Sequence, residues 1–203
     1  MNTGNTKTSA AMPGASYYDA NFQLEAAKVL PGEFIATNRD MLLVTVLGSC
    51  VSVCLRDPVA GVAGLNHFSL PDGVSDQDAL TNLPERYGQH AMEVLIDEMV
   101  RLGGDRRRFE AKVFGGGSVL RGMLKSNIGE RNVDFVRRFL AEESVPVLAE
   151  DLLDCYPRKV YYFTLSGRVL VKKIKDVHNR TIYERECAYR DRLRRQPFKG
   201  FPS

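Results

Sequence analysis

The sequence is poor in the features that mark membrane, secreted and metal-binding proteins. It has no tryptophan, three histidines and four cysteines in 203 residues. No stretch approaches the roughly 20 apolar residues that a membrane-spanning helix needs, so we expect no membrane insertion. The first 20 residues lack both the basic start and the apolar segment of a secretory signal. We therefore expect a cytoplasmic protein.

The cysteines also lack the spacing of a metal site. They are Cys50, Cys54, Cys155 and Cys187, with no C-x-x-C pair among them and no histidine at a zinc-type spacing. In a reducing compartment they are expected to be free thiols. Nothing in the sequence calls for a metal or an organic cofactor, and we expect neither.

Composition indicates one globular domain with peripheral segments. The chain is 44% hydrophobic and 26% charged, which is enough apolar sequence for a substantial core. Residues 1–21 are rich in Thr, Ser, Ala, Gly and Asn and are expected to form a disordered tail. We assign residues 22–175 to the globular domain and residues 176–203 to a basic, helical C-terminal extension.

The C-terminal extension carries the whole charge excess. It contains seven Lys or Arg and four Asp or Glu, and seven minus four equals the net charge of +3 for the full chain. Acidic residues are interleaved with the basic ones, which favours a solvated helix over a nucleic-acid-binding surface. We expect no nucleic-acid partner.

The most informative stretch is 41–71, which reads as strand, turn, strand, turn, strand. A β-branched run ends in the small-residue turn Leu47-Gly48-Ser49, and Cys50 begins the next strand. Alternation along that strand places Cys50 and Cys54 on one face and the intervening valines on the other. With Pro58 and Val59 at the centre of the second turn, paired residue numbers sum to 117. This register sets Cys50 opposite His67.

Directly opposed side chains on one face of an antiparallel pair have Cβ atoms roughly 4.5 to 5.5 Å apart. An imidazole that takes the proton of a thiol creates a nucleophile. Because Cys50 follows a turn, we expect it to be accessible and the most reactive of the four thiols. The alternative reading is a buried structural Cys and an ordinary half-buried His. A register slip of one residue would also separate the two side chains.

The remaining chain alternates helices and strands. Helices are expected over 89–102 and 129–143, and strands over 33–37, 109–114, 145–149, 159–164 and 168–172. Gly115-Gly116-Gly117 follows a strand without the G-x-G-x-x-G or G-K-[ST] pattern of a phosphate loop, so close backbone approach explains these glycines better. The expected fold class is α/β, with mixed, mostly antiparallel sheets in a single domain.

Several blocks together resemble one known family. They are Thr45-Val46-Leu47-Gly48-Ser49-Cys50-Val51, Asn66-His67-Phe68 with Leu70-Pro71, Lys112-Val113-Phe114-Gly115-Gly116, Ile128-Gly129-Glu130-Arg131-Asn132 and Pro157-Arg158-Lys159-Val160. In this order, across about 28–175, they resemble the bacterial chemoreceptor glutamine deamidases, the CheD family. The resemblance implies a layered sandwich of sheets with flanking helices.

The resemblance also implies a cysteine hydrolase that converts receptor glutamines to glutamates. It gives Cys50 the role of nucleophile and His67 that of base and acid, with an upstream threonine, Thr45 or Thr37, as the third member. The partners that it implies are methyl-accepting chemotaxis receptors and a chemotaxis phosphatase of the CheC type.

The residues themselves suggest where an oxyanion would be held. Backbone N–H groups around Gly48, Ser49 and Val51 are expected donors, because small residues leave the main chain accessible. Two other functions remain open at this point. One is a different thiol enzyme, such as a peptidase or a transglutaminase-like acyl transferase, and the other is a non-catalytic regulator that binds receptors and a phosphatase.

Overall fold

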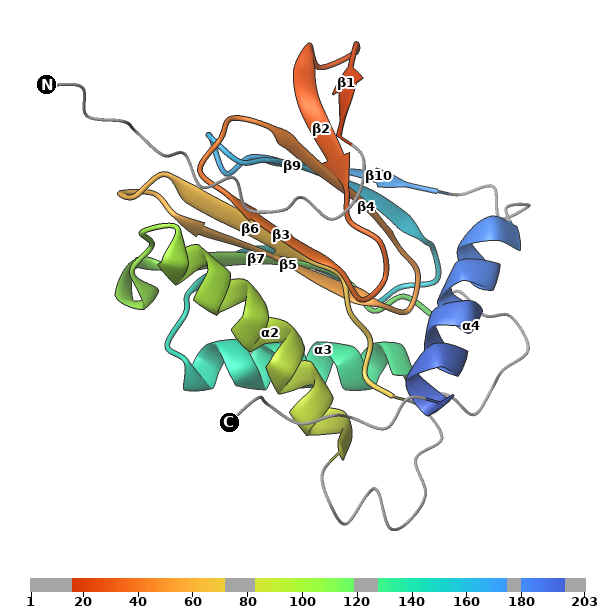
Figure 1. Cartoon of the computed structure of the whole chain (residues 1–203). Helices are drawn as coiled ribbons and strands as arrows, with labels where there is room; N and C mark the ends of the chain where they lie inside the picture. Colours follow the sequence, from red (N-terminus) through yellow and green to blue (C-terminus); the bar gives the residue numbers. More distant parts are fainter. Residues whose placement is uncertain (1–15, 72–82, 119–127, 175–179, 196–203) are drawn as a thin grey trace, which may run out of the picture.

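The structure is a computed structural model, and it describes residues 16–71, 83–118, 128–174 and 180–195 (Figure 1). Most of the expected N-terminal tail lies outside these residues. Its last part differs from the expectation, because Tyr17–Asp19 form a short strand, β1, beside the next strand. Within the described residues, no helix is long and apolar enough to cross a membrane.

In the part of the chain that the structure describes, ten strands form two five-stranded sheets. The first sheet has the order β1-β2-β4-β9-β10 and consists of β1, β2 (Leu24–Lys28), β4 (Leu42–Leu47), β9 (Arg158–Phe163) and β10 (Val169–Lys173). The second has the order β3-β6-β5-β7-β8 and consists of β3 (Phe34–Thr37), β6 (Val62–Asn66), β5 (Val51–Asp57), β7 (Glu110–Gly115) and β8 (Val147–Leu152). All neighbouring pairs are antiparallel except β2 with β4 and β7 with β8. The expected mixed, mostly antiparallel sheets are confirmed.

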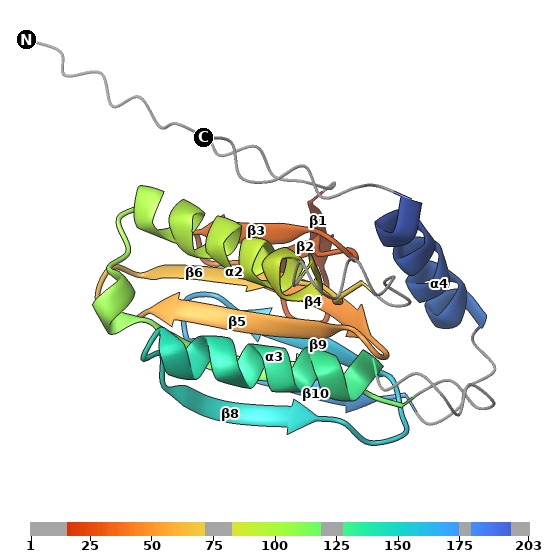
Figure 2. The ribbon, with the colours of Figure 1, turned by 90° about the horizontal axis from the view of Figure 1, so that it is seen from below.

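Helices complete the layers. The helices α2 (Leu83–Arg101) and α3 (Ile128–Glu142) lie side by side over the second sheet, as Figure 2 shows. A short 3-10 helix, η1, spans Arg106–Arg108. The last helix, α4 (Arg180–Arg195), stands apart from these layers at one end of the sandwich (Figures 1 and 2). The layered α/β sandwich is therefore confirmed.

The strand carrying Cys54 divides two apolar cores. Val51, Val53 and Leu55 belong to the core under α2 and α3. Cys54, like Cys50 just before the strand, belongs to the core between the two sheets. The expected alternation of faces along this strand is confirmed, and it directs the Cys50 side chain to the face that meets the first sheet.

The expected register of the hairpin formed by β5 and β6 is wrong by two residues. Cys54 pairs with Leu65 and Asp57 with Val62, so paired numbers sum to 119 instead of 117. The reason is a four-residue turn: Gly61 N donates to the Asp57 carbonyl oxygen at 3.0 Å, and Gly61 has a φ of 66°. Asp57 therefore faces Val62, where the sequence-based register had it facing Ala60.

The two-residue error in register still leaves the side chains of Cys50 and His67 close together. The isolated bridge between Val51 and Phe68 continues the observed register, which sets Cys50 opposite Ser69. Cys50 and His67 become diagonal neighbours. Since side chains alternate with a period of two, a shift of two residues keeps both on the same face, where one residue would have separated them.

Asp57 is the polar anchor of this turn. Its buried carboxylate accepts hydrogen bonds from the backbone N–H groups of Val59, Ala60 and Asp105. It also forms an ion pair with Arg108, with a shortest N–O distance of 2.7 Å. The Arg108 guanidinium holds the pKa of Asp57 well below its usual range. The stabilisation it provides is thus present at neutral pH and is lost as the pH falls below about 4.

We predict that Asp57→Ala lowers the free energy of unfolding by about 3 kcal/mol at neutral pH, because it leaves buried donors without an acceptor. Urea denaturation measures the change. Arg101→Ala is the matched control, since its ion pair with Glu98 lies at the surface and is expected to contribute less than about 1 kcal/mol. Equal effects of the two substitutions would contradict this account of the turn.

Candidate active site

Cys50 lies in the tight turn that joins β4 to β5, and two glycines after β7 hold that turn closely. Gly116 N donates to the Cys50 carbonyl oxygen and Gly117 N to the Gly48 carbonyl oxygen, both at 2.8 Å. A Cβ on Gly115 would lie only 2.2 Å from the Cys50 carbonyl oxygen. Gly115 also has a φ of 114°. The reading of this glycine run as a site of close backbone approach is confirmed.

Asn132 on α3 fastens the same turn from the other side. Its buried amide nitrogen donates to the Ser49 carbonyl oxygen at 2.8 Å, and its amide oxygen accepts from Leu70 N at 2.8 Å. This side chain ties the Cys50 turn to the segment that follows His67. The sequence carried a signal for it, because Asn132 lies on the buried face of α3 one turn before Val136.

His67 follows β6 directly and is fixed by backbone hydrogen bonds on both sides. His67 N donates to Glu33 O at 2.9 Å, and Gly32 N donates to His67 O at 2.7 Å. The side chain is almost completely buried. Its Nδ1 lies 2.8 Å from the hydroxyl oxygen of Thr45 on β4.

The Thr45 hydroxyl sets the tautomer of this ring. It donates to the Val29 carbonyl oxygen at 2.8 Å, and a carbonyl oxygen can only accept. The single hydroxyl hydrogen is thus used, so Thr45 must accept from Nδ1–H of His67. A neutral ring with its proton on Nδ1 leaves the lone pair on Nε2. This is the nitrogen that a general base needs toward Cys50.

The two candidate threonines differ in their contacts. The Thr37 hydroxyl oxygen accepts from Arg39 N at 3.0 Å, at the end of β3. Among the two, it is Thr45 that contacts the imidazole. Sequence order alone left both open.

A carboxylate that the sequence did not indicate completes the site. Ligand atoms of Cys50, His67 and Glu186 all lie within 4.8 Å of one another, and all three residues are buried. Glu186 belongs to α4, 136 residues from Cys50 along the chain. A thiol, an imidazole and a carboxylate form a donor set that suits Zn²⁺. Sequence spacing predicts no such set, since the three residues come from distant segments.

Both oxygens of Glu186 are held by the Cys50 turn. Oε1 accepts from Gly48 N at 2.7 Å and from Cys50 N at 3.3 Å. Oε2 accepts from Ser49 N at 2.9 Å and from the Ser49 hydroxyl at 2.7 Å. A Cβ on Gly48 would lie 2.8 Å from either carboxylate oxygen, so this approach requires glycine. Three successive N–H groups thus form an anion-binding nest beside the thiol.

The expected oxyanion donors agree with this nest in part. The N–H groups of Gly48 and Ser49 point into it. Val51 does not fit the expectation, because its N–H donates to the Phe68 carbonyl oxygen at 2.9 Å in the β-ladder. Cys50 N takes the third place.

Burial is the main cause that keeps both members of the pair neutral. Burial, followed by the Glu186 charge and a hydrogen bond to Glu186, raises the pKa of Cys50 well above its usual value. Burial lowers the pKa of His67 to about 4, against the opposing effect of Glu186. The expectation of an accessible and reactive Cys50 is wrong for this state, because the thiol is completely buried. Cys155 is the exposed thiol.

A cavity of about 180 Å³ adjoins the site between β2, β4 and α4. Its lining includes Thr45, His67 and Glu186 together with the basic residues Lys28, Lys159 and Arg185. The cavity therefore reaches His67 and Glu186, and its lining includes no residue of the Cys50 turn.

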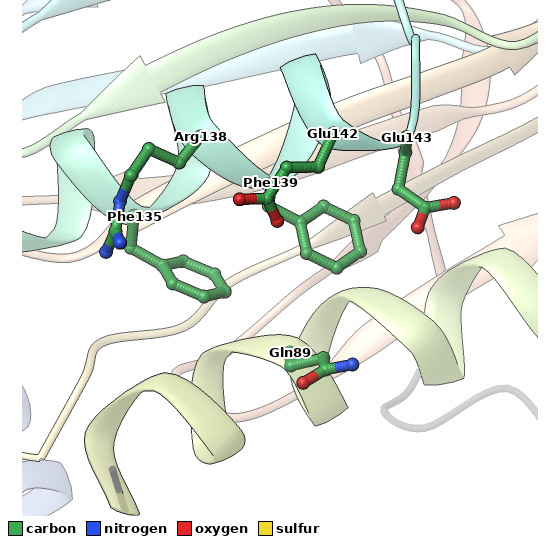
Figure 3. A pocket seen from close by; sticks show the side chains of 6 residues that line it. All are labelled: Gln89, Phe135, Arg138, Phe139, Glu142 and Glu143. Carbon is green, nitrogen blue, oxygen red and sulfur yellow. The ribbon is translucent and has the colours of Figure 1, made fainter.

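A second pocket lies between α2 and α3 (Figure 3). Its lining residues are Gln89, Phe135, Arg138, Phe139, Glu142 and Glu143. These include neither a thiol nor an imidazole, so this pocket holds no Cys-His pair for nucleophilic acyl chemistry.

We predict that His67 stays neutral in the folded protein from about pH 8 down to about pH 5, because its pKa lies below the usual 6.5. NMR of the imidazole signals, assigned with His67→Gln, measures the titration. The unfolded chain binds this proton below about pH 6.5, so stability falls as the pH drops from there toward about 4. A normal titration midpoint would contradict the described burial.

Known proteins resemble this chain closely. The family described as CheD chemotactic sensory transduction matches residues 69–173. A protein of Laribacter hongkongensis (strain HLHK9), named probable chemoreceptor glutamine deamidase CheD, is 70% identical over 98% of either chain. A protein of the same name from Herminiimonas arsenicoxydans is 55% identical over 91% of either chain.

A solved structure, the hypothetical protein YfiH of Bacillus licheniformis, aligns with a TM-score of 0.39 at 16% identity, over 61% of this chain and 51% of that one. The near full-length sequence matches decide the relationship: the chain belongs to the CheD family.

Proposed function

We propose that this protein is a cysteine-dependent protein-glutamine deamidase, a hydrolase that converts glutamine side chains of chemotaxis receptors to glutamate and releases ammonia. It would thereby tune chemotaxis signalling. The observation that carries the proposal is the contact between Thr45 and His67 beside the Cys50 thiol and the N–H nest. The names of the relatives, chemoreceptor glutamine deamidases, supply the substrate class.

The first step is attack by sulfur on the side-chain carbonyl carbon of glutamine. Nε2 of His67 takes the thiol proton, and the Cys50 thiolate forms the C–S bond. Thr45 accepts from Nδ1–H and so stabilises the imidazolium, the role of the third member in a catalytic triad. The proton on Nε2 then passes to the departing nitrogen, and ammonia leaves.

The N–H groups of Gly48, Ser49 and Cys50 hold the oxygen that becomes negative in this step. Their present ligand is a carboxylate, whose oxygens stand in for the carbonyl oxygen of the substrate. Donors fixed by the backbone need no reorganisation when charge develops, which is why such sites lower the barrier. Water, activated by His67, then hydrolyses the thioester and releases glutamate.

The partners follow from the same reading. Chemotaxis receptors are the protein substrate, and a chemotaxis phosphatase of the CheC type is the second partner that the family resemblance implies. We also propose a cytoplasmic location, which the four free thiols support.

We predict that Cys50→Ala abolishes conversion of glutamine to glutamate in a receptor cytoplasmic fragment, while binding of the fragment survives. Loss of the nucleophile removes the covalent route, and remaining catalysis typically lies several orders of magnitude lower. Mass spectrometry of the fragment and an ammonia assay measure turnover. Cys155→Ala is the control, because that thiol is exposed and is not among the residues that meet at the site.

Peptide cleavage in place of ammonia release would indicate a peptidase, and full turnover by folded Cys50→Ala would contradict the mechanism. A chemotaxis phenotype that does not change with Cys50→Ala would favour a non-catalytic regulator.

The other two members should differ in their effects. His67→Ala is expected to lose activity as completely as Cys50→Ala, because members of one catalytic unit are not additive. Thr45→Val keeps the shape but removes the acceptor for Nδ1–H, so kcat should fall by roughly 10- to 1,000-fold, with little change in KM. Steady-state kinetics on the receptor fragment test this order. An equal loss in Thr37→Val would move the third role away from Thr45.

A further inference from the structure

One face of α4 packs against the domain at the mouth of the site. Glu186, Tyr189 and Arg190 are buried, and Ile182 and Leu193 are partly buried. Their spacing along the chain forms a single helical stripe. The expectation of a solvated helix is wrong for this stripe, although residues such as Glu184 and Asp191 on the other faces are exposed.

The other contacts of α4 reach α2 and the segment that holds His67. The Tyr189 ring packs so closely on Gly32 that a Cβ at this position would lie 2.8 Å from the ring. Gly32 N in turn donates to the His67 carbonyl oxygen. The Tyr189 hydroxyl lies 2.9 Å from the Tyr87 hydroxyl on α2. Arg192 donates to the Pro31 carbonyl oxygen at 3.1 Å. The helix is thus anchored on α2 and on the segment of Pro31 and Gly32, which holds the His67 backbone.

The centre of the stripe is the unusual feature. Burying a carboxylate is costly unless several donors compensate for the lost water. Here the compensating donors are three backbone N–H groups and one hydroxyl of the Cys50 turn, next to a thiol. A glutamate side chain is also what glutamine becomes on deamidation. The Glu186 carboxylate therefore lies where the glutamate formed by the proposed reaction would lie.

We infer that α4 occupies the active site as a tethered product analogue, with Glu186 in the place of the glutamate that the reaction forms. This inference rests on the proposed function. It also makes α4 a competitor that substrate must displace.

Tethering gives α4 an advantage over a free helix. A segment attached to the domain competes at an effective concentration set by its linker, commonly near millimolar. The apparent affinity for substrate then falls by the fraction of molecules in which α4 is undocked. The negative charge of Glu186 beside the thiol also opposes formation of the thiolate, so the docked state is inactive for two reasons.

The variant Glu186→Gln tests whether α4 occupies the site in this way. In Glu186→Gln the helix would carry a substrate amide into the nest. Cys50 sulfur would bond the side-chain carbonyl carbon, the C–N bond would break, and ammonia would leave with the proton from His67. Water would then cleave the thioester, return a proton to sulfur and leave glutamate at position 186. The overall reaction consumes one water and releases one ammonia.

We predict that full-length Glu186→Gln hydrolyses the side-chain amide that it carries at position 186 and so restores the glutamate. Peptide mass spectrometry follows the conversion during incubation of the purified chain. The rate should not depend on protein concentration, because the reaction is intramolecular. Glu184→Gln is the matched control on the same helix: its side chain is exposed and should remain an amide. The double variant Cys50→Ala/Glu186→Gln should keep its amide as well.

The outcomes separate the inference from the function on which it rests. If the amide at position 186 persists in a Glu186→Gln chain that deamidates a receptor fragment, the inference is overturned and the deamidase stands. Conversion that needs no Cys50, or that speeds up with protein concentration, would also overturn the inference. Failure to deamidate either position 186 or the fragment would instead count against the proposed function.

A second experiment tests competition. Glu186→Ala removes the buried carboxylate and weakens docking of α4, so we expect kcat/KM on the receptor fragment and the alkylation rate of Cys50 each to rise at least tenfold. Glu184→Ala removes the same charge from the exposed face and should change neither rate. Rates that stay the same or fall in Glu186→Ala would overturn the inference, because a competitor cannot assist turnover.

Discussion

The site depends on three backbone N–H groups that point the same way from one turn. Those of Gly48, Ser49 and Cys50 converge on two oxygen atoms of a carboxylate, which an ordinary β-turn does not achieve. The turn keeps this shape because Gly116 N and Gly117 N bond its carbonyl groups, and Asn132 bonds the carbonyl between them. Glycine is required where these backbones meet. The nucleophile, its oxyanion donors and their ligand are therefore positioned by one set of main-chain contacts.

Local periodicity accounts for what the sequence could predict. Alternation along 50–55 assigns the faces of Cys50 and Val51 correctly, because side chains on a strand alternate with a fixed period of two. Helical spacing likewise locates most of α2 and α3. Pairing distances depend on turn geometry, and the Pro58–Gly61 turn is two residues longer than the assumed one. The predicted face of Cys50 is still correct, because the face that a side chain occupies depends only on whether the register shift is even.

Contacts between distant segments account for what the sequence did not reveal. Glu186 lies on a helix whose mixed charges are typical of a solvated surface, and no local rule tells its carboxylate from that of Glu184. The choice of Thr45 over Thr37 depends on the contact of Thr45 with the imidazole, which joins two different sheets. Asn132 gave a weak signal as a polar residue on an apolar face. In each case the partner is fixed by tertiary structure.

Charge distinguishes substrate from product in such a site. A glutamine amide is neutral, so its binding leaves the Cys50 thiol free to lose a proton to His67. A glutamate carboxylate in the same nest adds a negative charge beside the sulfur and is one of the causes that raise the pKa of Cys50. The donors that stabilise an oxyanion also bind this carboxylate well, so product must leave before the thiol can ionise again. A built-in glutamate uses that same property, holding the nucleophile protonated and covered until a substrate amide takes its place.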